Sequence, residues 1–265
     1  MPKEPVHIIQ NPASRQFIFD IGKLGSQKHY VRGLVEVDIT EALRKIKEQR
    51  APGHKLTLFS WLVKVTADTV LRHPPLNGVK LAGNRIMVYE DVDVSLTIEK
   101  VVDGVPVPLP LIVRQANLKT PVQINDEIQA AKDQVVEDKG NYVLGQKRDV
   151  FFMNLAAALP QWLRLIFWRK VLLGKRMQAM MGSVMITSVG MLGSLKGWIV
   201  PSSVHPLAIA MGSVNKQAAL HDGEVQKRDI LHLTIAVDHD IIDGIPAAMF
   251  CDDLVRRLEA AQGLE

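Results

Sequence analysis

The sequence has little cysteine and few aromatic side chains: Cys251 is the single cysteine among 265 residues, and Phe, Trp and Tyr make up 5%. One cysteine excludes an internal disulfide framework and favours a reducing compartment, so we expect a cytoplasmic protein. Residues 1–17 contain no apolar segment of the kind that secretory signal peptides carry. An uncharged run of about 20 apolar residues, which a membrane span needs, is also missing. The nearest candidate, residues 159–176, is interrupted by Pro160 and by Arg and Lys residues.

The chain has little charge of one sign in excess. Its formal net charge is +4, and the lysines and arginines are spread without a long basic run. Nucleic acid is therefore not the favoured partner. A mild positive bias suits a phosphorylated or carboxylated ligand. With 47% hydrophobic residues, the chain can bury the core of a globular domain.

Hydrophobic periodicity predicts alternating strands and helices. The expected strands are 32–40, 84–100 (kinked or at an edge), 105–113, 183–190, 206–214 and 231–238, and the expected helices are 41–50, 56–73, 121–138 and 245–262. Short turns join the later strands, which favours a mixed sheet with flanking helices over a doubly wound parallel sheet. We predict one α/β domain over residues 1–265, in which residues 1–13 form an N-terminal extension and residues 139–175 give no readable pattern.

A histidine and an aspartate four residues apart, His239 and Asp243, follow the last predicted strand in "AVDHDIIDGIPAAMF" (236–250). The end of a strand fixes a side chain on a rigid element while leaving it accessible. Taken alone, the pattern is more typical of a polar turn than of a catalytic site. A metal site formed by residues 238, 239, 240 and 243 is a third interpretation. It is disfavoured because no second histidine or cysteine lies nearby in the sequence.

Several segments together resemble one family. Residues 238–244 resemble a D-H-R-x-x-D-G signature, and "GSVMITSVGMLG" (182–193) is similar to G-G-T-F-T-I-S-N-L-G-M-F-G. Residues 205–214, 90–117 and 71–78 also resemble motifs that occur in the same order. The family is that of the dihydrolipoamide acyltransferase components of 2-oxo acid dehydrogenase complexes. Their catalytic domain shares the fold of chloramphenicol acetyltransferase.

The resemblance implies an acyltransferase that moves an acyl group between coenzyme A and the thiol of dihydrolipoamide or another acceptor. It assigns His239 as the general base and Thr187, in place of a serine, as the hydroxyl that stabilises the oxyanion. Asp243 would then hold the histidine loop in shape, with Gly244 and Arg15 as supporting residues and Arg15 as its salt-bridge partner. The fold also implies a homotrimer whose active site lies between subunits. No metal and no bound lipoyl group are expected.

Two other functions stay open at this stage. A trimeric scaffold without activity could keep the fold, although it would need none of the residues His239, Asp243 and Thr187. A condensation-type transferase also carries an H-x-x-x-D-G motif, but such enzymes are usually far longer. Without the resemblance, Thr187 would be interpreted as an ordinary strand threonine. Cys251 is predicted to be a packing thiol in the last helix and not a nucleophile.

The sequence departs from the family in three places. Upstream of the catalytic region there is no room for a lipoyl domain, so we expect any lipoyl group to come from a carrier on another chain. Asp240 stands where the family usually has arginine. Residues 139–175 are longer than the family's connection, and residues 160–175 mix aromatic and basic side chains. We favour a core or subunit-contact helix there over contact with a membrane surface or docking to a partner chain. The short polar C-terminus favours a trimer that does not assemble further.

Overall fold

A six-stranded mixed sheet organises the computed structural model, which describes residues 15–49, 56–102, 105–134, 158–172, 174, 176–188, 196–221 and 223–264. The strand order is β1-β8-β7-β6-β4-β5. The bounds are β1 Tyr30–Asp38, β4 Val94–Val102, β5 Val105–Val113, β6 Val184–Ser188, β7 Leu207–His221 and β8 Glu224–Asp238. Strand β6 pairs in parallel with β4 and β7, and the other pairs are antiparallel, which confirms the predicted mixed sheet.

The edge strand β5 carries proline at every second position, at 106, 108 and 110. Alternate residues of an edge strand direct their N–H groups away from the neighbouring strand, so proline costs no ladder hydrogen bond there. Among the described strands β5 pairs with β4 alone, which places it at the edge of the sheet.

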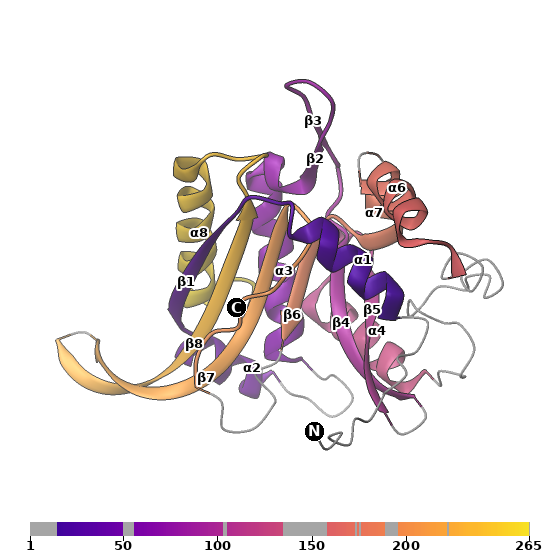
Figure 1. The fold of residues 1–265 in the computed structure, drawn as a ribbon. Helices are drawn as coiled ribbons and strands as arrows, with labels where there is room; N and C mark the ends of the chain where they lie inside the picture. Colours follow the sequence, from indigo (N-terminus) through magenta and orange to yellow (C-terminus); the bar gives the residue numbers. More distant parts are fainter. Residues whose placement is uncertain are drawn as a thin grey trace, which may run out of the picture.

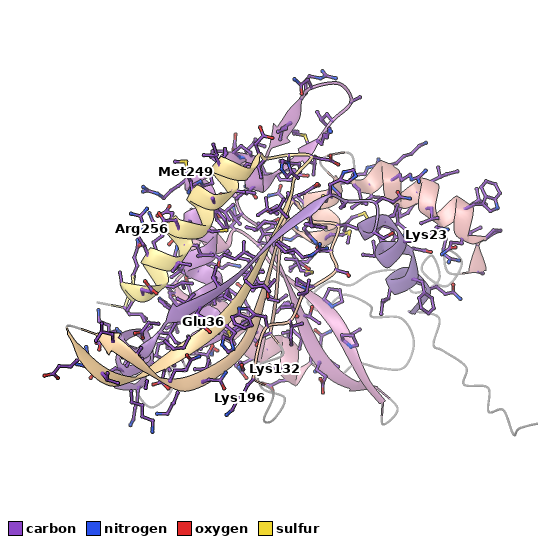
Figure 2. The ribbon with its side chains drawn as sticks, turned by 60° about the vertical axis from the view of Figure 1, so that its left-hand side comes forward. Lys23, Glu36, Lys132, Lys196, Met249 and Arg256 are labelled. Carbon is purple, nitrogen blue, oxygen red and sulfur yellow. The ribbon has the colours of Figure 1, made fainter. Side chains whose placement is uncertain are left out.

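Four helices cover one face of the sheet (Figure 1). They are α2 Thr40–Glu48, α3 Leu58–Arg72, α4 Pro121–Asp133 and α8 Gly244–Glu259. Fully buried Trp61 of α3 and Phe250 of α8 pack in one cluster with Ile186, Ile209 and other apolar strand residues. On the outer side of α8, Met249 and Arg256 point away from the sheet (Figure 2).

Two further helices, α1 Arg15–Gly25 and α6 Gln161–Leu172, lie side by side away from that helical layer (Figures 1 and 2). A short helix, α7 Arg176–Met181, follows α6 and leads into β6. The sequence pattern predicted neither α1 nor α7. No helix of the described residues is long and apolar enough to cross a membrane.

The prediction of one strand over residues 84–100 is wrong. The segment forms β3 Ile86–Val88, which pairs with β2 Gly78–Lys80 in a small hairpin, and then β4. Between them the backbone leaves the sheet because Val92 bonds elsewhere: its N–H donates to the Asn117 side chain, and its C=O accepts from the N–H of Ala116. Strands β7 and β8 extend beyond the predicted ranges, since their polar outer parts pair with each other.

Candidate functional site

A tight turn carries His239 from the end of β8 into α8. The last strand residue, Asp238, is opposite Tyr30 of β1, and α8 begins at Gly244. The backbone N–H of His239 donates to the carbonyl oxygen of His29 at 2.8 Å. Its side chain remains 44% exposed. The sheet therefore fixes the backbone of His239 while its imidazole stays accessible.

The carboxylate of Asp238 organises this turn. Asp238 is fully buried, and the ammonium group of Lys28 donates to its Oδ2 at 2.5 Å. The backbone N–H of Asp240 donates to Oδ1 at 3.2 Å. The N–H groups of Ile241 and Ile242 donate to the Asp238 carbonyl oxygen. The ion pair between Lys28 and Asp238 thus lies at the base of the turn that carries His239.

Asp240, which replaces the arginine of the family motif, lies among basic groups. Its Oδ1 is 3.2 Å from Nδ1 of His29 and 3.9 Å from Nζ of Lys80. A cavity of about 210 Å³ opens here between the β2–β3 hairpin and the turn. Its lining comprises Lys80, residues 83–86 and residues 239–243. The hairpin therefore brings a positive charge to the cavity that His239 faces.

Within the single chain, the side chain of Asp243 and the position of Gly244 do not anchor the turn. The Oδ1 atom of Asp243 is 3.9 Å from Nδ1 of His239, beyond hydrogen-bonding distance, and the Asp243 side chain is 91% exposed. A Cβ atom added at Gly244 would contact no described atom within 4 Å. The side chain of Arg15 lies outside the described part of the chain. The roles of these three residues stay predictions.

Thr187 and His239 are far apart within one chain. Thr187 of β6 is in register with Ala210, which is in register with Thr234 of β8. His239 follows Thr234 by five residues, or about 16 Å along the strand, and β6 lies two strands, or about 10 Å, from β8. Thr187 is half-buried on the sheet face opposite the main core. One chain therefore cannot bring this hydroxyl to this imidazole.

A second, buried histidine lies under the turn, and the sequence analysis did not identify it. Nε2 of His205 is 2.9 Å from the Met181 carbonyl oxygen, which can only accept, so this nitrogen carries the proton. Nδ1 accepts from the Ser203 hydroxyl at 2.9 Å, and Tyr30 donates to the His205 carbonyl oxygen at 2.6 Å. Burial, with the nearby charge of Lys28, lowers the pKa of His205 to about 4. No periodic signal distinguishes this histidine from a surface residue that precedes a strand.

The structure also bears on two alternatives from the sequence analysis, which are Cys251 as a nucleophile and a metal site at residues 238–243. Cys251 packs against the main core, and its burial raises the pKa of the thiol, which makes it a poorer nucleophile. Within the described ranges, no three His, Cys, Asp or Glu side chains come together in a group that could hold a metal ion. Asp238, one of the carboxylates considered for such a site, already binds Lys28.

Comparison with known families agrees with the motifs. The family model described as 2-oxoacid dehydrogenases acyltransferase (catalytic domain) matches residues 27–142 and 174–264. A curated relative is the dihydrolipoyllysine-residue acetyltransferase component of the pyruvate dehydrogenase complex of Mycoplasma pneumoniae, 27% identical over 214 residues. That match covers 80% of this chain and 43% of the relative. The chain spans less than half the length of the curated relatives it matches.

Solved structures share the fold. One is dihydrolipoamide acetyltransferase from Azotobacter vinelandii, with a TM-score of 0.69 and 19% identity, covering 100% of this chain and 99% of that one. That structure was used to investigate the roles of a serine, a histidine and an asparagine in the catalytic mechanism. The asparagine lies four positions after the histidine. A chloramphenicol acetyltransferase aligns with a TM-score of 0.50 and 14% identity over 97% of both chains. The predicted chloramphenicol acetyltransferase-like fold is confirmed.

We expect Lys28→Met to destabilise the protein, because it leaves the Asp238 carboxylate buried without a counter-charge. Removing one partner of a buried ion pair costs about 3–5 kcal/mol of unfolding free energy. The double variant K28M/D238N should recover a large part of that loss, since it removes the unpaired charge. Urea unfolding of the two variants measures this, with Lys47→Met at an exposed position as the control. Equal losses in K28M and K28M/D238N would contradict the importance of the pair.

The free energy of unfolding should fall as the pH drops from about 6.5 towards about 4. In this window the unfolded chain binds a proton at His205 that the folded chain excludes, because the folded pKa lies below the ordinary value of 6.5. The contribution of this one group is about 3 kcal/mol. Chemical unfolding of the wild type and of His205→Gln at several pH values measures it, and the wild type should show the steeper loss. Parallel pH profiles would contradict it.

Proposed function

This chain belongs to the family of the 2-oxoacid dehydrogenases acyltransferase catalytic domains, and on that premise we propose that it transfers an acyl group between coenzyme A and a thiol acceptor. The observation that carries the proposal is His239, which stands in the histidine position of the family motif with a fixed backbone and an accessible side chain. The cavity of about 210 Å³ beside it leaves room for part of a substrate.

In the proposed reaction, the attacking thiol gives its proton to the neutral imidazole of His239. The thiolate sulfur then bonds to the thioester carbonyl carbon, and the electron pair of the C=O bond moves onto the oxygen. The hydroxyl of Thr187 donates a hydrogen bond to this oxyanion, which stabilises the transition state by about 3 kcal/mol. When the carbonyl re-forms, the bond to the first sulfur breaks, and His239 returns the proton to the departing thiolate.

We further propose that the site is completed between the subunits of a homotrimer, with His239 from one subunit and Thr187 from its neighbour. The separation of these residues within one chain supports this arrangement, because it makes the single chain an incomplete catalyst. Asp243 follows His239 by four positions, which is the spacing between the histidine and the asparagine named for the Azotobacter protein. A carboxylate there can orient the imidazole through Nδ1 and pair with Arg15.

The acceptor we propose is a dihydrolipoyl thiol on a separate carrier chain. A carrier thiol reacts with the same histidine and hydroxyl as the thiol of coenzyme A, in the reverse direction. Asp240, where the family has arginine, changes the charge beside the reacting groups, and Lys80 of the hairpin compensates for it. The single cysteine favours a reducing location, so we place the reaction in the cytoplasm.

Replacing His239 with alanine should lower the rate of acyl transfer by about 10²–10⁴, the contribution of a general base. Thr187→Val keeps the β-branched shape and removes the hydroxyl, and should cost about 10²–10³. Release of free thiol from acyl-CoA, in the presence of a dihydrolipoyl acceptor, measures both rates. Lys47→Met, at an exposed position of α2, is the control and should leave the rate unchanged.

The mass of each variant in solution is to be measured beside its rate. Loss of activity in a particle of unchanged mass assigns the residues to the reaction itself. A rate in His239→Ala that stays within about twofold of the wild type would contradict general-base catalysis. Such a result would favour the non-catalytic scaffold.

A further inference from the structure

Helix α6 exposes its apolar side chains. Trp162 is 62% exposed, Ile166 47% and Phe167 50%, and Leu163 is also exposed. At 100° per residue these four side chains fall within an arc of about 140° on one side of the helix. This side of α6 is therefore outside the core of the single chain, and the contact between subunits that we expected for residues 160–175 stays a prediction.

The opposite side of α6 is held by polar contacts. The guanidinium of Arg164, which is 7% exposed, donates to Asp20 of α1 through Nε at 2.6 Å and through a second nitrogen at 3.1 Å. Asp20 is fully buried and also accepts from Gln161. Gln16 of α1 accepts from the same guanidinium. A buried ion pair often adds little to the free energy of unfolding, but it can specify one arrangement of two helices. The Arg164–Asp20 pair therefore fixes which side of α6 faces outward.

The charged groups within and beside the exposed apolar arc are basic. Arg169 and Lys170, in the last turn of α6, are exposed, and neither pairs with a carboxylate among the described residues. Lys23 lies on the neighbouring α1, where Figure 2 shows it close to α6, and Arg176 begins α7. The sequences of α1, α6 and α7 contain one acidic residue, Asp20, and it is buried against Arg164.

Helix α6 is also separate from the acyltransferase fold as the family defines it. The family model matches residues 27–142 and 174–264, so all of α6 lies outside it. The helix contributes no residue to the lining of the cavity beside His239, and its last residue, Leu172, packs in one cluster with Val79 and Met87 of the β2–β3 hairpin. The exposed arc therefore lies outside both the residues that the family model matches and the lining of the cavity.

We propose that the exposed side of α6 binds the surface of an anionic membrane. Tryptophan and phenylalanine side chains with flanking lysine and arginine are the composition of helices that lie in the membrane interface. The apolar arc enters the boundary between headgroups and acyl chains, and Arg169 and Lys170 pair with lipid phosphates. Lys170 lies near the middle of the arc, where its long stem reaches out to the headgroups. The protein then lies on the membrane with α6 parallel to its plane.

The test is flotation of the full-length protein with vesicles. Binding is expected to vesicles of phosphatidylcholine mixed with phosphatidylglycerol, to be weak with phosphatidylcholine alone, and to fall as salt rises. Arg169→Gln/Lys170→Gln should weaken binding by about fivefold for each charge removed. Lys47→Gln/Lys196→Gln, which removes two exposed lysines elsewhere, is the matched control and should bind as the wild type does. Equal binding by the two double variants would overturn the proposal.

Insertion of the aromatic side chains is tested by fluorescence. Brominated lipids quench a tryptophan that enters the acyl region, and we expect quenching in the wild type that Trp162→Phe loses. Ile166→Ser should weaken flotation, whereas Leu118→Ser, at a 68% exposed position elsewhere, should not. If Ile166→Ser instead lowers the mass of the particle in solution, α6 contacts a second copy of the chain and the membrane proposal fails. Failure of the protein to bind any vesicle would also overturn it. Neither measurement depends on acyl transfer.

Discussion

The buried ion pair between Lys28 and Asp238 is the interaction on which the histidine turn depends. Asp238 is the last residue of β8, and its carboxylate and carbonyl oxygens accept the hydrogen bonds that shape the turn. Lys28 supplies the charge that allows a carboxylate to be buried there. This turn fixes the backbone of His239. The ion pair therefore positions the imidazole that we propose as the general base.

The proposed active site combines fixed backbones with an accessible side chain. Strand β6 fixes the backbone of Thr187 and the turn after β8 fixes that of His239, whereas the His239 side chain is partly open to solvent. In the proposed trimer, the site excludes water only after the subunits assemble, and we therefore expect the isolated chain to be inactive. The exposed side of α6, which contributes no residue to the cavity beside His239, is the surface that we propose to bind a membrane.

The sequence predicted the mixed sheet and the position of His239 because both rest on local patterns. Large apolar residues alternate over 231–238 because one face of β8 joins the main core, while small and polar residues are buried on its other face, and the histidine follows directly after the strand. It did not predict the partner of Asp238, since Lys28 is 210 residues away and only β1–β8 pairing brings the two together. Likewise, Arg164 is a basic residue inside an apolar segment, and only its contact with Asp20 explains why the apolar side of α6 faces outward.

The most direct test of a site shared between subunits is the activity of mixed oligomers. His239→Ala and Thr187→Val, each inactive alone, are unfolded together in equal amounts, refolded, and assayed for acyl transfer. In randomly assembled trimers, about one interface in four joins an intact His239 to an intact Thr187, so the mixture should regain up to about a quarter of the wild-type rate. A mixture no more active than its two components would contradict the account.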